Sequence, residues 1–239
     1  MFQNFRWLAR ATRSRRARFA SLAALVVLTV SALPAQQTGV HPVTGRRFAE
    51  VMDAAGAAWL DRPEREVEEA PDEALSIIGV KKGATVADVG SGSGYMTIRL
   101  SKKVGPTGVV YASDIQQRML DLLGARLKAA RITNVRPVLG TPDDPKLPAA
   151  SIDLAILVDV YHEFSQPQAM LQRLRDALKP GARLVLLEYR KEDPSIPIRP
   201  EHKMSVDEAK KEIEPEGFRL NRVDDGLPRQ HVLIFTRKQ

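Results

Sequence analysis

Short apolar segments alternate with amphipathic, helix-like segments over most of the chain, from residue 85 to residue 213. The apolar segments 154–158 and 184–187 contain no polar residue. Uninterrupted apolar strands of this kind are typical of a sheet that helices cover on both faces. Parallel strands also need long crossover connections, and the helix-like segments supply them. The alternation therefore predicts an α/β fold with a doubly wound, mostly parallel sheet.

The last two expected strands, 218–223 and 231–236, are separated by too few residues for a helical crossover. They should form a hairpin, which makes the final strand antiparallel. A helical pattern also begins at Phe48, breaks near Pro63 and resumes over residues 72–78. The other expected strands are 85–89, 109–112, 135–139, 152–158 and 183–188, and the other expected helices are 96–104, 116–130, 168–178 and 206–213.

Composition limits the class of protein. The chain has 239 residues, 44% of them hydrophobic, which is enough for one domain with a full core. It contains no cysteine, which excludes disulfides, a zinc-thiolate site and a cysteine nucleophile.

The first 35 residues differ in character from the rest. They carry six arginines and no acidic residue, and the arginines precede an uncharged run at residues 19–33. A basic segment, an apolar segment and then Leu33-Pro-Ala35 are typical of a secretory signal that is cleaved after Ala35. The pattern predicts export to the periplasm, or a membrane tether through residues 19–33 if the segment is not cleaved. A start codon chosen too far upstream would instead leave a cytoplasmic protein.

The remaining chain divides into a linker, residues 36–47, and a domain, residues 48–239, that begins with a helical cap. The formal net charge is +7, but without the six arginines 30 basic residues face 29 acidic ones. A nearly neutral body without a basic stripe argues against nucleic acid as a partner.

Three glycines follow the first expected strand at every second position, Gly90, Gly92 and Gly94. In an open α/β sheet, ligands bind beyond the carboxyl ends of the strands. Glycine lets backbone amides approach a ligand and permits positive φ angles. The spacing predicts that this loop holds a ligand through its backbone.

The neighbours of the loop narrow the choice of ligand. A dinucleotide fold would show G-x-G-x-x-G, whereas this series is G-x-G-x-G. No Lys-Ser or Lys-Thr pair follows, which excludes a phosphate-binding P-loop. Asp88 precedes the glycines, and Asp114 follows the second strand, where an acid can accept hydrogen bonds from both hydroxyls of a ribose.

With these residues, the chain from about residue 70 to its end resembles the class I S-adenosylmethionine-dependent methyltransferases. The resemblance implies a Rossmann-like, seven-stranded sheet of order 3-2-1-4-5-7-6 with strand 7 antiparallel. It also implies that S-adenosylmethionine is the cofactor. Its methionine end would lie against Asp88 and the glycine loop with Ser91, its ribose on Asp114 and its adenine near Ile115. Asp143 is favoured over Asp144 for an adenine contact, although neither directly follows Gly140.

The fourth strand is followed by four polar residues that should stand beside the transferable methyl group: Asp159, Tyr161, His162 and Glu163. We assign Asp159 to the cofactor and the other three to catalysis. His162 is the strongest candidate for a general base near neutral pH, which is needed only if the acceptor arrives protonated. A residue that opens a helix also often has a structural role.

Other polar residues are interpreted as structural. A magnesium site at the ends of strands four and five would use Asp159, but Arg190 would oppose a cation, so we predict no metal. His202 is expected to be a solvated loop residue, and His41 and His231 suggest no site. The charged run 64–69 is expected to be a solvated helix face, with Trp59 and Leu60 packed over the active site.

These observations favour an S-adenosylmethionine-dependent methyltransferase that acts on a small molecule. A catalytically degenerate, exported S-adenosylmethionine-binding protein is the second hypothesis, because the cofactor is made in the cytoplasm. An NAD-dependent oxidoreductase is the third, and the glycine spacing disfavours it. The segments 48–70 and 196–204 are expected to select the substrate.

Overall fold

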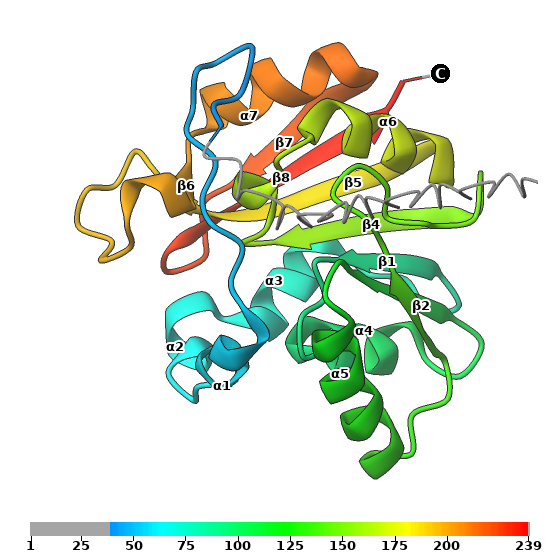
Figure 1. Ribbon diagram of the computed structural model, residues 1–239. Helices are drawn as coiled ribbons and strands as arrows, with labels where there is room; N and C mark the ends of the chain where they lie inside the picture. The colour runs from blue at the N-terminus through cyan, green and yellow to red at the C-terminus, as the bar shows by residue number, and fades with distance from the viewer. Residues whose placement is uncertain (1–38, 239) are drawn as a thin grey trace, which may run out of the picture. The chain divides into compact units, whose positions relative to one another are not determined.

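The computed structural model describes residues 39–238, and one twisted sheet runs through them (Figure 1). Its order is β3-β2-β1-β4-β5-β8-β7, and a short strand, β6, pairs with β5 beside this path. The strands are β1 Thr85–Val89, β2 Val109–Asp114, β3 Val135–Leu139, β4 Ile152–Val158, β5 Leu178–Arg190, β6 Lys203–Met204, β7 Phe218–Asp224 and β8 Gln230–Arg237.

The expected order 3-2-1-4-5-7-6 is confirmed. When the short strand β6 is left out of the count, β7 is the sixth strand along the chain and β8 is the seventh. Neighbouring strands from β3 to β5 pair in parallel, whereas β8 is antiparallel to both β5 and β7. The hairpin prediction for the C-terminus is therefore confirmed. Pairing between β4 and β5 shifts its register near residue 153, so β5 begins earlier than expected and includes the turn-like residues 179–181.

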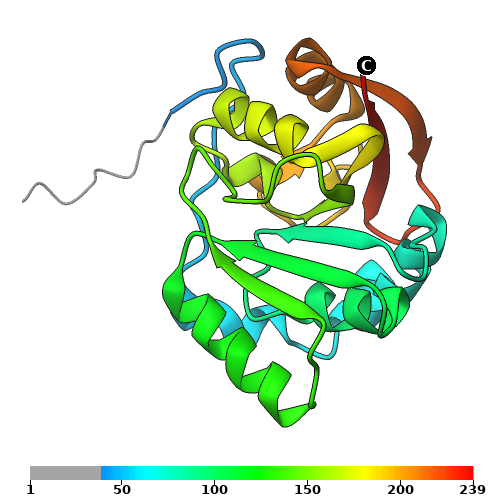
Figure 2. The same ribbon diagram turned by 90° about the vertical axis from the view of Figure 1, so that its right-hand side faces the viewer.

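Helices cover both faces of the sheet, as Figures 1 and 2 show. Leu154 and Ile156 of β4 pack with α3, α4 and α5, and Ala155 and Leu157 pack on the opposite face with α6 and α7. Both faces are thus buried, which explains the continuous apolar strands. The helices are α1 Ala57–Leu60, α2 Arg65–Glu69, α3 Pro71–Ile78, α4 Tyr95–Val104, α5 Gln117–Ala129, α6 Pro167–Ala177 and α7 Val206–Ile213, with 3₁₀ turns η1 Ala54–Gly56, η2 Tyr161–Glu163, η3 Pro200–His202 and η4 Glu214–Glu216.

The N-terminal part of the domain departs from the expected helix. The chain is not helical from Phe48 to Asp53, and the first turn, η1, begins at Ala54. The backbone N–H of Ala49 donates to the carbonyl of His162 (3.0 Å), and the Asp53 side chain caps the N–H of Ala55 (2.7 Å). Tertiary hydrogen bonding thus overrides the local helical pattern until Asp53 starts the turn.

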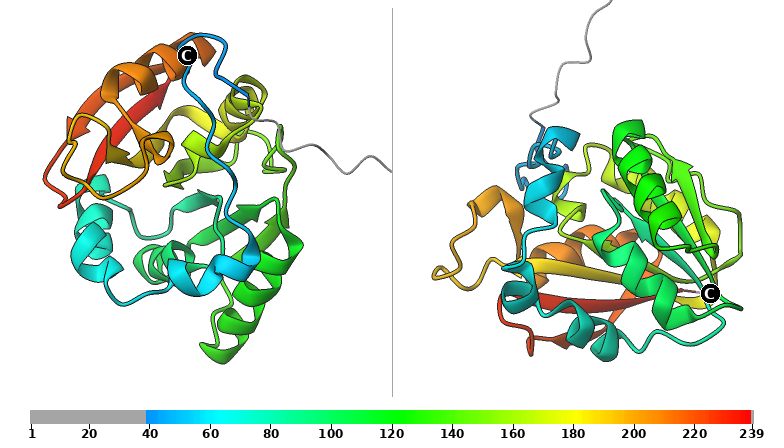
Figure 3. Two further views of the ribbon diagram at one scale, coloured as in Figure 1. Left: turned by 60° about the vertical axis from the view of Figure 1, so that its left-hand side comes forward. Right: turned by 90° about the horizontal axis from the view of Figure 1, so that it is seen from below.

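The described part of the expected linker packs against the domain. Val40 and Arg47 form an isolated antiparallel bridge, and His41 and Arg46 are buried beside Glu212 of α7. Figure 3 shows this segment leading from α7 across the edge of the sheet to the cyan helices α1 and α2. Residues 40–47 therefore anchor the segment that crosses the site.

No helix among residues 39–238 combines the length and the apolar character that a bilayer crossing requires. The predicted signal segment, residues 1–35, lies outside the described residues.

Candidate active site

The glycine loop connects β1 to α4 at the carboxyl edge of the sheet. Gly90, Gly92 and Gly94 have φ angles of 74°, 52° and 93°, in the left-handed region that favours glycine. A Cβ on Gly90 would lie 2.3 Å from Cγ2 of Val160, and one on Gly94 would lie 2.4 Å from Cδ1 of Leu123. Backbone conformation thus favours glycine at all three positions, and the close approach of neighbouring side chains adds a second constraint at Gly90 and Gly94.

Asp114 lies at the end of β2 and is bonded to this loop. Its Oδ2 accepts the N–H of Gly92 and its Oδ1 accepts the N–H of Gln116, each at 2.8 Å. These bonds fix the carboxylate while each oxygen keeps capacity to accept another donor. Burial raises the pKa of Asp114, although the backbone donors oppose this shift. The next residue, Ile115, is 40% exposed, which is uncommon for a large apolar side chain and leaves it free to contact a ligand.

Asp88, near the end of β1, and Ser91, in the loop, are both buried. The hydroxyl of Thr97 donates to Oδ2 of Asp88 (2.5 Å), and burial raises the pKa of Asp88 to about 6. Among residues 39–238, the buried Oγ of Ser91 has no hydrogen-bond partner. A buried polar atom without a partner is costly unless a ligand or water satisfies it. These two side chains fit a polar ligand group at the position where the methionine end of S-adenosylmethionine was expected.

In the loop after β3, the side chains of the two acidic residues form hydrogen bonds within the loop. The Thr141 hydroxyl donates to Oδ1 of Asp143 (2.6 Å), and Oδ1 of Asp144 accepts the N–H of Lys146 (2.7 Å). The Asp143 side chain is exposed and Asp144 is partly buried. The exposed Asp143 side chain is therefore accessible to an adenine ring, but its bond to Thr141 is made within the turn and does not direct it toward a ligand.

Asp159 follows β4 and has a positive φ of 50°. This conformation is uncommon for a residue with a side chain and concentrates at functional sites. Gln230 donates to its Oδ2 (2.6 Å), whereas its buried Oδ1 has no partner among residues 39–238. Burial, followed by the charges of Glu69 and Glu188, raises the pKa of Asp159 well above its usual range.

The expectation that the charged run 64–69 is a solvated face is wrong for Arg65 and Glu69. These side chains are buried and form a salt bridge of 2.7 Å, and the hydroxyl of Tyr189 donates to Glu69 (2.9 Å). The two charged residues stand four apart on α2, so they share the face that packs against the end of β5. The i,i+4 spacing of opposite charges was the sequence signal, but it gives no indication of burial.

His162 is held firmly at the end of β4. It is 2% exposed, and its Nδ1 lies 2.6 Å from Oε2 of Glu188 in β5. The N–H of Tyr161 donates to the other oxygen of Glu188 (3.0 Å). Burial opposes the charged imidazole, but the carboxylates of Glu188, Glu163 and Asp159 together raise the pKa of His162. Glu188 was not predicted as a site residue, because it lies within an apolar strand pattern.

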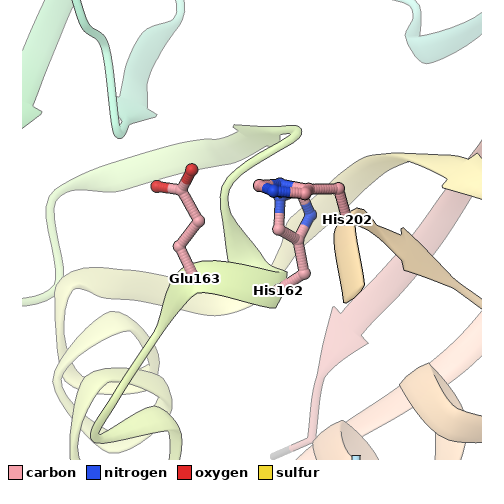
Figure 4. Close-up of side chains that lie close together, drawn as sticks. All are labelled: His162, Glu163 and His202. Atoms are coloured by element: carbon pink, nitrogen blue, oxygen red, sulfur yellow. The ribbon is translucent and has the colours of Figure 1, made fainter. Parts of the chain in front are cut away.

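His202 is not a solvated loop residue. It is half-buried in η3, and its Nδ1 lies 3.2 Å from Nε2 of His162 (Figure 4). Burial and the neighbouring His162 lower the pKa of His202. Glu163 stands beside this pair, and burial raises the pKa of Glu163 to about 7, although the charge of His162 opposes that shift.

Tyr161 points into the core. Its side chain is fully buried, packs edge-on against Phe164 and lies beneath the guanidinium of Arg46. This position gives a substrate no access to the phenol, so the structure favours a structural role for Tyr161 over the predicted catalytic one.

A segment near the N-terminus covers the site. Gln116 accepts the N–H of Ala54 (3.0 Å) and donates to the carbonyl of Met52 (2.8 Å). Leu60 reaches the loop, since a Cβ on Gly92 would lie 3.3 Å from its Cδ1. Trp59, in contrast, is 47% exposed and stacks with Arg62. Of the two residues expected over the site, only Leu60 contacts the glycine loop.

Comparisons with known proteins agree with this fold and site. A family model described as a methyltransferase domain matches residues 86–181, which include the glycine loop and both acidic residues beside it. An S-adenosylmethionine-dependent methyltransferase from Aquifex aeolicus is 30% identical and superposes with a TM-score of 0.73, covering 78% of this chain and 98% of that protein. A structure described as a type 11 methyltransferase from Sulfolobus solfataricus shares the fold with a TM-score of 0.60 at 20% identity.

Among curated relatives, the ubiquinone/menaquinone biosynthesis C-methyltransferase UbiE of Escherichia fergusonii is 32% identical over 114 residues. This match spans 47% of the chain and about half, 45%, of that relative. The chain belongs to the class I S-adenosylmethionine-dependent methyltransferases. It is therefore an enzyme of the transferase class, and S-adenosylmethionine is its cofactor.

Proposed function

We propose that this methyltransferase acts on a small molecule. The first acceptor class to test is a quinol, the reduced form of a quinone. The relatives of the UbiE type, which are named as quinone C-methyltransferases, support this choice. The nearly neutral charge beyond the first 35 residues argues against a nucleic-acid substrate.

The observation that carries the proposal is the set of polar groups around the glycine loop. Asp114 is fixed by two backbone donors. The buried Ser91 hydroxyl and Asp88 carboxylate supply polar atoms that can form hydrogen bonds with a ligand. Asp88 and Ser91 would hold the methionine end of S-adenosylmethionine, and Asp114 would accept its ribose hydroxyls. The cofactor supplies a methyl group on a sulfonium, already activated for transfer.

The acceptor would be positioned at the edge formed by the ends of β4 and β5. Asp159, with its unpartnered oxygen, and the pair of His162 and Glu188 face this edge from the two strands. Methyl transfer needs an aligned acceptor more than it needs covalent help, so rigid side chains at this position favour the reaction. The segment of residues 49–60 contacts this edge through the bond of Ala49 to the His162 carbonyl.

The test is methyl transfer by the full-length protein. S-adenosylmethionine with a labelled methyl group would be incubated with reduced quinones and simpler phenols, and products would be identified by mass spectrometry. Calorimetric titration of S-adenosylmethionine and S-adenosylhomocysteine would run in parallel. Label on a ring carbon of a quinol supports the proposal, and label on other acceptors alone would replace the substrate class. Cofactor binding without transfer to any acceptor would favour the binding-protein hypothesis.

A further inference from the structure

Three potential metal ligands converge at the end of β4. The donor atoms of His162, Glu163 and His202 all lie within 4.8 Å of one another, and Figure 4 shows the two imidazoles meeting beside the carboxylate. His162 and Glu163 are sequence neighbours in η2, but His202 comes from η3, 40 residues further along the chain. The fold alone brings these three side chains together.

The two imidazoles have the geometry of ligands that share one ion. His162 Nε2 and His202 Nδ1 are 3.2 Å apart, and the ring planes are nearly perpendicular, at 81°. Two imidazole nitrogens on one tetrahedral ion, each with a bond of about 2.0–2.1 Å, lie roughly 3.4 Å apart. The observed separation therefore needs almost no adjustment to accept an ion.

Glu188 orients the imidazole of His162 for metal binding. It is fully buried, and its Oε2 lies 2.6 Å from Nδ1 of His162. A proton on Nδ1 satisfies this contact and leaves the lone pair of Nε2 directed at His202. Histidine ligands of metals characteristically donate their other N–H to a carboxylate in this way. Two nitrogen lone pairs at 3.2 Å repel unless a proton or a metal ion lies between them.

We propose that His162, His202 and Glu163 bind one divalent transition-metal ion, with zinc as the best-suited ion and Glu188 as the positioning residue for His162. Two imidazoles and one carboxylate suit zinc and its neighbours, whereas magnesium prefers oxygen ligands. Three protein ligands leave a tetrahedral ion one position for water or for an oxygen of the substrate.

This site differs from the magnesium site that the sequence argued against. That site would have used Asp159 near Arg190, and neither residue belongs to the present cluster. The three donor atoms lie within 4.8 Å of one another, a limit wider than the roughly 3.4 Å between two donors on one tetrahedral ion. Metal binding should draw the Glu163 carboxylate toward the two imidazoles.

The experiment measures metal binding by the full-length protein, independently of methyl transfer. The protein would be treated with a chelator and titrated with ZnCl₂ by calorimetry and with CoCl₂ by visible absorption, which reports tetrahedral nitrogen and oxygen ligation. We expect one ion per chain, with affinity reduced at least 100-fold in His202→Ala and tenfold to 100-fold in Glu188→Gln.

The matched control is Glu201→Gln, which alters the neighbour of His202 outside the cluster and should bind zinc like the wild type. Circular dichroism would check the folding of each variant. If His202→Ala does not fold, Glu163→Gln provides the second test and should weaken zinc and change the cobalt spectrum. Absence of zinc and cobalt binding in the wild type, or unchanged binding in folded His202→Ala, would overturn the proposal and leave a hydrogen-bonded histidine pair. Neither result depends on whether a quinol is methylated.

Discussion

The backbone N–H of Gly92 donates a hydrogen bond of 2.8 Å to Oδ2 of Asp114, which joins the loop after β1 to the end of β2. One carboxylate thus helps to fix the conformation of the glycine loop and also lies where we expect the ribose of the cofactor. Loop geometry and ligand affinity should therefore change together when this side chain is altered.

Asp114→Asn tests this coupling. The amide places a donor where the carboxylate accepts at least one backbone N–H, and it removes the charge expected on the ribose hydroxyls. We expect S-adenosylmethionine to bind more weakly by about 1.5–3 kcal/mol, measured by calorimetric titration. Asp121→Asn is the matched control, because Asp121 is exposed on α5 and its side chain accepts a hydrogen bond from Gln117 of the same helix. Equal affinities for the two variants would remove Asp114 from the cofactor site.

Gly90→Ala should destabilise the protein strongly. The new methyl group would meet Val160 at 2.3 Å, and the φ of 74° is strained for alanine. We expect a loss of about 2–3 kcal/mol in the free energy of unfolding, measured with urea. Gly124→Ala provides the contrast, since a Cβ there meets nothing within 4 Å and α5 should gain up to about 1 kcal/mol. A Gly90→Ala protein as stable as the wild type would contradict the close approach to Val160.

Asp88 should make stability depend on pH. Burial raises its folded pKa to about 6, above the ordinary 3.8, so the folded protein holds this proton more tightly than the unfolded chain. The cost of the buried charge is absent at low pH, grows as the pH rises between these two values and is complete above about 6. It reaches at most about 3 kcal/mol.

Asp88→Asn removes that cost. Denaturant unfolding of the cofactor-free variant should show greater stability than the wild type at pH 7 and a smaller difference at pH 4. Its affinity for S-adenosylmethionine should fall. A variant less stable than the wild type at pH 7 would show that the amide cannot satisfy the hydrogen bond with Thr97.

Arg46 should be essential for anchoring the N-terminal segment. Its guanidinium bonds to buried Glu212 (2.9 Å) and to the carbonyl of His162 (3.1 Å). Arg46→Ala leaves the Glu212 carboxylate buried without its main cation, which should cost about 3–5 kcal/mol of stability in thermal or urea unfolding. Arg47→Ala changes the exposed neighbour and should stay within about 0.5 kcal/mol of the wild type. Similar losses in both variants would rule out a specific role for Arg46.

The sheet could be predicted because its signals are local. Continuous apolar segments such as 154–158 indicate burial on both faces, and the short connection before β8 permits only a hairpin. The loop glycines were also predictable, since positive φ and close packing both demand glycine at Gly90 and Gly94. In these cases the constraint lies in the residues themselves or in their immediate neighbours.

The side chains at the ends of β4 and β5 were harder to predict, because they contact residues that are distant in sequence. The sequence around His202 is that of an ordinary loop, and only the fold places His202 beside His162. Glu188 follows an apolar strand segment, so the sequence gives no sign that it contacts His162. The charges of Arg65 and Glu69 suggest exposure to solvent, but the salt bridge between the two side chains allows both to be buried. Residues 48–53 carry a helical pattern, but they form no helix because their backbone groups bond to His162 and Gln116, which are distant in sequence. Contacts between remote segments decide the outcomes for His202, Glu188 and residues 48–53, and a periodicity argument does not detect such contacts.

The segment of residues 49–60 has a consequence for the catalytic cycle. Ala49 is bonded to the His162 carbonyl, and Leu60 lies against the glycine loop, so one continuous segment of main chain, here called the lid, connects the end of β4 with the loop after β1. We expect S-adenosylhomocysteine to leave only after this lid moves, because the lid contacts the loop on which the cofactor is expected to bind. The spent cofactor should consequently have a long residence time, and a burst of one methyl transfer per enzyme should precede a slower steady state set by lid opening.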